Sequence, residues 1–212
     1  MFKDREEAAG RLADALAACR GRRPLVLAIP RGAVPMARLI AERLGGDFDV
    51  VLVRKLRAPH QPELAIGSVD ESGWTYLAPH AASTGADQDY LAREKQAQLQ
   101  TIRQRRAQYS PIHPPIDPAG RVVIVVDDGL ATGATMMAAL HSLREKKPAR
   151  LICAVPVAPP ETAAEVRKLA DQLVCLETPA WFQAVGQFYR DFPQVEDEDV
   201  MALLKERRHQ PP

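Results

Sequence analysis

The sequence predicts an α/β protein in which helices flank a central, mainly parallel β-sheet. Short apolar runs of strand length alternate with helical patterns along the chain, as they do in βαβ units. The run VVIVV at 122–126 is apolar on both faces, which is typical of a strand covered by helices on both sides of a parallel sheet. A chain of 212 residues is long enough for one sizeable core and hardly long enough for two full domains.

The elements follow one another in a regular order. Leu12, Leu16 and Cys19 lie at helical spacing and predict an amphipathic helix near the N-terminus. After it we expect strands at 25–29 and 48–53 around a helix at 34–44, a hairpin at 64–77, a helix at 87–109, and then strands at 122–126, 149–155 and 172–177 separated by helices at 134–145 and 161–170. The basic cluster RKLR at 54–57 is expected just after the second strand.

The last 35 residues differ in composition from the rest. Five of the eleven aromatic residues fall within positions 181–192, and an acidic segment with a helical pattern at 197–208 follows them. We expect this region to form a cap, or hood, on the sheet. The predicted organisation is therefore a single domain over 1–212, with a core at about 24–178 and the hood and terminal helix at about 179–208.

Charge and cysteine content narrow the class of protein. The formal net charge of +1 does not favour a nucleic-acid or membrane partner, since such proteins usually carry a strongly basic face. No run approaches the roughly 20 apolar residues of a transmembrane helix, and the N-terminus does not resemble a signal peptide. Three cysteines without CxxC spacing favour buried free thiols in a reducing compartment, so we expect a cytoplasmic protein.

The strongest functional motif is VVIVVDDGLATGAT at 122–135, in which a strand leads into two acids, a loop rich in Gly and Thr, and a helix. Ligands of open α/β sheets bind at the carboxyl ends of strands, where a helix N-terminus attracts phosphate. Asp127 and Asp128 can hold ribose hydroxyls, or a Mg²⁺ ion bound to them. An ordinary strand-to-helix turn would need only one Asp and one Gly. The motif is neither a Walker A loop nor a GxGxxG fingerprint.

This motif resembles the signature of the type I phosphoribosyltransferases, with a departure at Gly129, where most members have an aliphatic residue or Ser. The resemblance implies the type I phosphoribosyltransferase fold and binding of phosphoribosyl pyrophosphate (PRPP). Asp127 and Asp128 would bind the ribose 2- and 3-hydroxyls and contact Mg²⁺ indirectly, through PRPP. The loop that would wrap the 5-phosphate consists of Ala131, Thr132, Gly133, Ala134 and Thr135.

A second stretch, LAIPRGAVPMA at 27–37, resembles the pyrophosphate loop of the family. Pro30, Arg31 and Gly32 would form a tight turn whose amides meet a phosphate, although an ordinary Pro-Gly turn would look the same alone. The pair Arg54 and Lys55, followed by His60, is similar to a stretch of orotate phosphoribosyltransferases. The resemblance implies that Lys55, Arg31, Asp127 and Asp128 are catalytic, and that pyrophosphate is bound by Pro30, Arg31, Gly32, Arg54, Lys55 and Arg190.

The segment ETPAWFQAVGQFYRDF at 177–192 resembles the hood of hypoxanthine-guanine phosphoribosyltransferases. The resemblance implies that Phe182 stacks on the acceptor and that Arg190 reaches pyrophosphate, whereas simple packing of the cap would also explain the aromatic residues. Two purine-specific features are absent. Ala131 replaces an acidic residue near the purine, and the strand end at 154–157 lacks the lysine that reads the 6-oxo group.

The implied function is an enzyme, a pentosyltransferase of nucleotide metabolism. With PRPP and Mg²⁺ it would transfer 5-phosphoribose to a nucleobase or another small nitrogen nucleophile and release pyrophosphate. The first alternative is a non-catalytic PRPP- or nucleotide-binding regulator, which would not need Lys55 or the pyrophosphate loop. The second is a PRPP-utilising partner of another catalytic protein. The helix at 87–109 would serve as a closing lid or as an oligomer contact, and we expect a homodimer.

Overall fold

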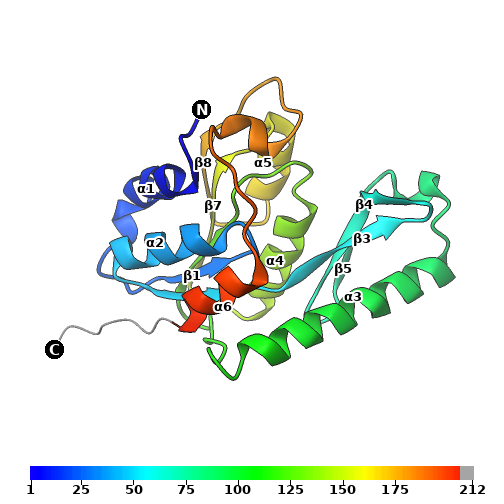
Figure 1. Cartoon of the computed structure of the whole chain (residues 1–212), viewed down its shortest axis with the longest axis horizontal. Coiled ribbons are helices and arrows are strands. Elements are labelled where there is room, and N and C mark those ends of the chain that lie inside the picture. Colours follow the sequence, from blue (N-terminus) through cyan, green and yellow to red (C-terminus); the bar gives the residue numbers. More distant parts are fainter. Residues whose placement is uncertain (206–212) are drawn as a thin grey trace.

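The computed structural model describes residues 1–205, so the predicted end of the terminal helix at 206–208 lies outside the described residues. Its centre is a five-stranded parallel sheet in the order β2-β1-β6-β7-β8, which confirms the predicted fold class (Figure 1). These strands are β1 Leu25–Ala28, β2 Asp47–Val50, β6 Val122–Val126, β7 Arg150–Val157 and β8 Gln172–Glu177.

Helices cover both faces of this sheet. They are α1 Arg5–Ala15 and α2 Val34–Leu44 on one face, and α4 Ala134–Glu145 and α5 Pro160–Arg167 on the other. Successive side chains of a strand point to opposite faces, and in β6 Ile124 and Val126 pack on the first face while Val123 and Val125 pack on the second. The uninterrupted apolar run of β6 therefore has a simple cause, because both of its faces lie in a core.

The basic cluster at 54–57 lies inside a strand, so the expectation that it merely follows one is wrong. Three strands form a separate antiparallel sheet: β3 Val53–Ala58, β4 Gln61–Asp70 and β5 Thr75–Leu77. In β3 the apolar residues are buried, while Lys55 and Arg57 are exposed. The three basic residues hide these buried positions in the sequence. The predicted hairpin is confirmed as β4 and β5, and its tight turn is closed by the Asp70 carboxylate, which accepts from the backbone N–H groups of Ser72 and Trp74.

The long polar helix is confirmed as α3 Gln88–Tyr109. It packs along β3 and β4, and together they extend away from the parallel sheet (Figure 1). Leu99 and Ile102 are buried against the antiparallel sheet. Asp87 caps the helix by accepting from the Tyr90 N–H. The last turns of α3 and the first part of β3 thereby bring cations to the carboxyl ends of the parallel strands.

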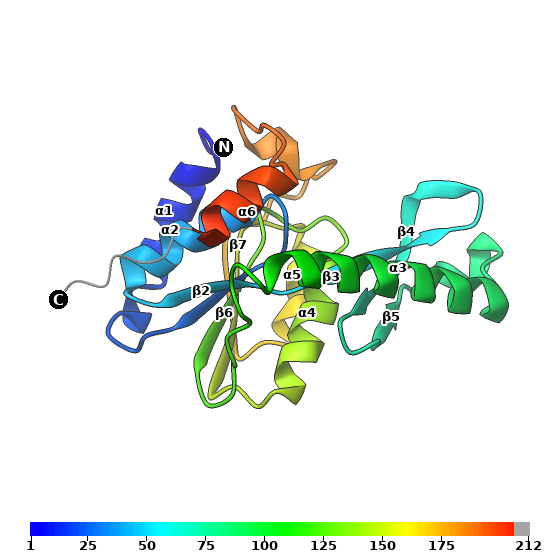
Figure 2. The ribbon, with the colours of Figure 1, turned by 60° about the horizontal axis from the view of Figure 1, so that its bottom comes forward.

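The N-terminus of the chain lies against the hood. The backbone N–H of Phe2 donates to the Phe188 carbonyl, and the Arg190 N–H donates to the Phe2 carbonyl. After the short 3₁₀ helix Val185–Phe188, helix α6 Asp197–Lys205 packs against α2 (Figure 2). Two further 3₁₀ turns are Ala17–Cys19 and Ala81–Thr84.

The predicted character of the cysteines agrees with the fold. Cys19 and Cys153 are buried, Cys175 is half-buried, and all three are free thiols. Within residues 1–205, none of the helices combines the length and the apolar character needed to cross a bilayer.

Candidate functional site

A cavity of about 290 Å³ lies at the carboxyl ends of β1 and β6. The predicted residues that line it are Pro30, Arg31, Gly32, Lys55, Asp127, Asp128 and the loop from Ala131 to Thr135. Ile29, Gly129, Leu130, Met136 and Val185 complete its wall. Residues about 100 positions apart in the sequence thus meet in one cavity, because parallel strands deliver their carboxyl ends to the same edge of the sheet.

The loop 131–135 leads directly into the N-terminus of α4. Gly133 is the N-cap residue with a φ of 73°, a left-handed conformation that favours glycine. The Thr162 hydroxyl anchors the loop by donating to the Ala131 carbonyl over 2.8 Å. The first N–H groups of a helix have no intrahelical acceptor and lie at the positive end of its dipole, so this turn can bind a phosphate group.

The departure at Gly129 has a steric cause in the hood. A Cβ atom at this position would lie 2.6 Å from Cγ1 of Val185 and 3.1 Å from Cγ1 of Val157. Val185 thus takes the space that a larger residue at 129 would fill, and it also contributes to the cavity wall. A hood residue therefore compensates for the missing side chain in the motif.

The two acidic residues lie side by side at the end of β6, and the backbone N–H of Asp128 donates to Oδ1 of Asp127 over 2.9 Å. Burial raises the pKa of Asp127 well above its ordinary value, and the neighbouring Asp128 carboxylate raises it further. Burial also raises the pKa of Asp128, and the Arg5 guanidinium opposes this increase. Ionisation of both acids therefore requires stabilisation of desolvated negative charge, which a cation or hydroxyl donors would supply.

Arg5, at the start of α1, is a residue of the site that the sequence did not reveal. Its Nε and Nη2 atoms donate to Oδ2 of Asp128 over 3.0 and 2.8 Å. Its Nη1 atom donates to the Pro193 carbonyl, and its guanidinium lies 3.7 Å from the centre of the Phe192 ring. Arg5 therefore ties an acid of the site to the hood. No local pattern could indicate this contact, because 123 positions separate the two charges.

The pyrophosphate-loop residues Pro30, Arg31 and Gly32 form the opposite wall of the cavity, and the peptide bond between Pro30 and Arg31 is cis. The Arg31 guanidinium pairs with the acidic start of the terminal segment, 3.0 Å from Glu196 and 3.8 Å from Asp197. The sequence did not predict these acidic partners.

Lys55 lies between this cavity and a neighbouring one of about 270 Å³. The second cavity is lined by the cations Arg54, Lys55, Arg57 and Arg105, by Glu63, and by Pro30, Val53, Pro62, Ala65 and Thr135. Arg54 also donates to the Gln98 side chain over 3.0 Å. The predicted Arg54 thus lies next to the main cavity, together with Arg57 of the same basic cluster and with Arg105, neither of which the sequence analysis assigned to the site.

Two predicted residues, Phe182 and Arg190, do not line the main cavity. The Phe182 ring packs 5.1 Å from the ring of Phe188. The Arg190 side chain is 66% exposed and lies 3.8 Å from Asp191. Their stacking and pyrophosphate roles stay predictions. The hood instead contributes Tyr189, whose hydroxyl donates to the Asp128 carbonyl over 2.6 Å.

The carboxylates fit a magnesium ion that is held mainly through a ligand. Among residues 1–205 no group of three or more His, Cys, Asp or Glu side chains could enclose a metal ion. Mg²⁺ commonly keeps several waters and is bound through one or two carboxylates together with substrate phosphates. Asp127 and Asp128, at the edge of a cavity that can accept phosphate, offer this kind of donor set.

A family model described as "Phosphoribosyl transferase domain" matches residues 2–193, and the chain belongs to this family. The chain is 40% identical over 210 residues to a Mycobacterium tuberculosis protein named "Putative phosphoribosyl transferase". That match covers 99% of the chain and 47% of the relative. The chain therefore spans about half the length of the M. tuberculosis relatives that it matches.

Further comparisons agree with the family. The adenine phosphoribosyltransferase of Rhodospirillum centenum is 34% identical over 97 residues, which cover 41% of this chain and 53% of that protein. Among solved structures, a Thermus thermophilus protein designated TT1426 has a TM-score of 0.81 and 46% identity, with 96% of this chain and 97% of that chain covered. The likeness confirms the type I fold.

Replacing Asp127 with Asn is expected to stabilise the fold at pH 8. The pKa of Asp127 is raised in the folded state, so its ionised carboxylate destabilises the fold. The favourable contribution of Asp127 is complete only below its unfolded pKa, and it is lost as the pH rises through the folded pKa. The melting temperature should rise by about 2–4 °C for each kcal/mol gained. Thermal unfolding between pH 4 and 8 checks this result, with Asp14→Asn on the exposed face of α1 as the control. A gain that grows on acidification would contradict it.

Proposed function

We propose that the protein is a phosphoribosyltransferase that binds PRPP and Mg²⁺ in the 290 Å³ cavity and transfers 5-phosphoribose to a small nitrogen nucleophile. The observation that carries this proposal is the convergence of the phosphate loop, the acid pair and the pyrophosphate loop on one cavity. These three groups can accommodate the 5-phosphate, the ribose hydroxyls and the pyrophosphate of one PRPP molecule.

In the proposed reaction the bond between C1 of the ribose and the pyrophosphate oxygen breaks, and a bond from C1 to the acceptor nitrogen forms. The ribose gains oxocarbenium character, and negative charge develops on the departing pyrophosphate. Lys55, Arg31 and the backbone amides around Gly32 would stabilise this charge. Mg²⁺, when bound, would further neutralise the pyrophosphate. Asp127 and Asp128 would orient the ribose through its 2- and 3-hydroxyls.

The acceptor site would lie where the hood meets the cavity. We propose that a nucleobase or another small nitrogen compound enters beside Val185, which lines the cavity. Stacking by Phe182 would require the hood to rearrange, because that ring packs on Phe188. A homodimer, a cytoplasmic location and a role in nucleotide metabolism are further predictions of this proposal.

A second candidate is a non-catalytic PRPP-binding protein. The observation in its favour is the ion pair between Arg31 and Glu196. Glu196 already neutralises the guanidinium that is expected to stabilise the leaving pyrophosphate. In the transferase, pyrophosphate would have to compete with Glu196 for this guanidinium.

Pyrophosphate release distinguishes the two candidates. The protein is mixed with PRPP, Mg²⁺ and a panel of purines, pyrimidines and small amines, with the Asp127→Ala, Asp128→Ala double variant as the control. A transferase should release pyrophosphate with a particular acceptor, and the rate of release by the double variant should be at least about 1,000-fold lower. Tight PRPP binding without release above the control would favour the second candidate.

A further inference from the structure

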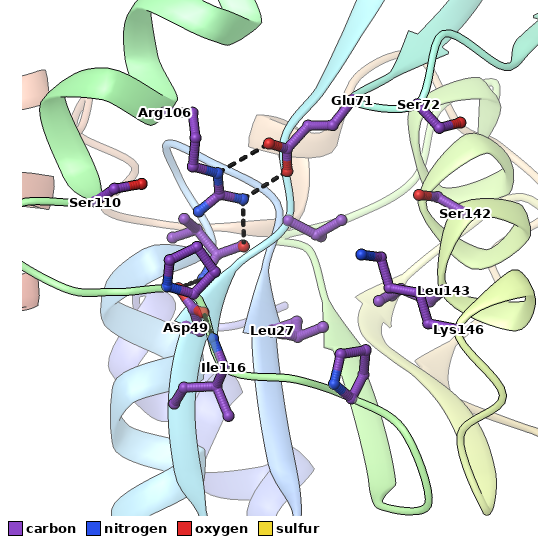
Figure 3. A pocket seen from close by; sticks show the side chains of 14 residues that line it. Leu27, Asp49, Glu71, Ser72, Arg106, Ser110, Ile116, Ser142, Leu143 and Lys146 are labelled. Carbon is purple, nitrogen blue, oxygen red and sulfur yellow. Dashed lines mark hydrogen bonds and ion pairs between the residues drawn. The ribbon is translucent and has the colours of Figure 1, made fainter.

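A larger cavity, of about 410 Å³, lies on the α4 side of the parallel sheet over β1 and β2 (Figure 3). None of the residues that line it lines the 290 Å³ cavity. Its walls come from the end of β2, the turn between β4 and β5, the ends of α3 and α4, and the proline-rich segment at 115–118. It is therefore separate from the site of the proposed transferase reaction.

Among residues 1–205, the helix that packs on β2 is α2, from the other face, and this leaves room for the cavity on the α4 side. β2 is an edge strand, and α4 packs on β6, β7 and the antiparallel sheet instead. Leu27, Val51 and Leu143 form an apolar lining, with Leu27 in the middle of the view in Figure 3. Each of the three is less than a tenth exposed, so a ligand would meet a rigid surface. The volume falls within the range of small-molecule sites, roughly 300–1,000 Å³.

Two cations line the cavity, and among residues 1–205 Arg106 has an ion-pair partner whereas Lys146 has none. Nε of Arg106 donates to Glu71 over 2.8 Å, and Nη2 contacts the same carboxylate, so the charge of this guanidinium is compensated. Lys146 extends its amino group toward the cavity from the opposite wall in Figure 3 and has no carboxylate within ion-pair distance among residues 1–205.

The acidic groups of the cavity do not balance this charge. Glu71 is neutralised by Arg106. The buried Asp49 carboxylate accepts from the backbone N–H groups of Val50 and Ile116 over 2.7 and 2.8 Å, and it lies 4.0 Å from Nε2 of His113. A ligand that carries negative charge would therefore be attracted by Lys146, whereas both carboxylates of the cavity already have hydrogen-bond or ion-pair partners.

We propose that this cavity is a binding site for a small organic anion, a compact apolar or aromatic body that carries a carboxylate or phosphate group. The charged group would lie at the amino group of Lys146, on the wall that also carries the Ser142 hydroxyl. The apolar body would rest on Leu27 and Leu143. We expect binding here to be independent of PRPP, because the two cavities share no residue.

The fluorescent anion 1-anilinonaphthalene-8-sulfonate is a suitable probe, since it combines an aromatic body with a single negative charge. Trp74 stacks on His141, the neighbour of Ser142, with the ring centres 3.7 Å apart. In a Trp181→Phe background, Trp74 is the only tryptophan of the chain and can transfer energy to a dye in this cavity. We expect saturable binding of one dye per chain.

Two charge reversals test the position of the dye. Lys146→Glu should weaken its binding at least about 10-fold, which corresponds to 1.4 kcal/mol. Lys147→Glu, an equal change of charge at the next residue and outside the cavity, should change the affinity less than about 2-fold. Thermal unfolding of both variants verifies that each is folded.

Competition identifies the chemical class of the ligand. Benzoate and phenyl phosphate represent the carboxylate and phosphate forms, and at least one should displace the dye, whereas inorganic phosphate at the same concentration should not. PRPP with Mg²⁺ should leave the dye bound. Absence of saturable binding, equal affinity in the two lysine variants, displacement by PRPP, or displacement by inorganic phosphate as strong as by phenyl phosphate would each overturn the proposal.

Discussion

Replacing Gly32 with alanine is expected to weaken PRPP binding at least about 100-fold, or 2.7 kcal/mol. An added Cβ atom would overlap Oδ2 of Asp128 and lie 3.1 Å from Nη2 of Arg5. Both groups are held in place by their own ion pair, so neither can yield without breaking it. The substitution should therefore displace a carboxylate proposed to bind the ribose and, at the same time, widen the pyrophosphate turn.

Calorimetric titration with PRPP and Mg²⁺ measures this effect. Gly10→Ala in α1 is the matched control, because its Cβ atom would meet only the end of the flexible Arg43 side chain, at 3.2 Å. The control should keep the wild-type affinity and melt at the same temperature or slightly higher, since Ala favours a helix more than Gly does. Wild-type affinity in the Gly32 variant would show that the turn does not contact PRPP.

Replacing Arg5 with methionine is expected to destabilise the protein by about 3 kcal/mol at neutral pH. The Arg5 and Asp128 side chains are only 11% and 16% exposed, so the substitution leaves a desolvated carboxylate without its partner. The loss should shrink as the pH falls through the folded pKa of Asp128, because protonation removes the charge that Arg5 stabilises.

Denaturant unfolding of a double-mutant cycle separates this effect from lost packing. Asp128→Asn should restore part of the stability lost in the Arg5 variant, since the uncompensated charge is then absent. Arg20→Met, which removes an exposed arginine, should change stability by less than about 0.5 kcal/mol. An Arg5 variant as stable as the Arg20 variant would contradict the proposed importance of the pair.

The sequence predicted most of the parallel sheet and the heart of the site because both depend on local patterns. The strand at 122–126 and the loop at 131–135 are nearly contiguous, and their apolar, acidic and small residues indicate their roles in order. The strand β3 escaped prediction because three basic residues lie among its three buried ones, two of them adjacent, so its sequence shows no regular alternation.

Contacts between distant segments were not predictable in the same way. Arg5 with Asp128 and Arg31 with Glu196 join parts of the chain more than 120 positions apart, and no neighbouring residue signals either pair. The roles of Phe182 and Arg190 were inferred from resemblance alone. The hood that carries them places Val185 at the cavity instead. The sequence could have suggested this position of Val185 only if Gly129 had been linked to a larger residue in the hood.

The central claim is that the acid pair and the two loops form one PRPP site, and calorimetric titration of the whole chain with PRPP and Mg²⁺ tests it most directly. We predict one PRPP per chain, competition by pyrophosphate and by ribose 5-phosphate, and binding at least about 100-fold weaker in the Asp127→Asn, Asp128→Asn double variant. Equal PRPP affinity in the double variant and the wild type, or no PRPP binding by the wild type, would contradict the claim.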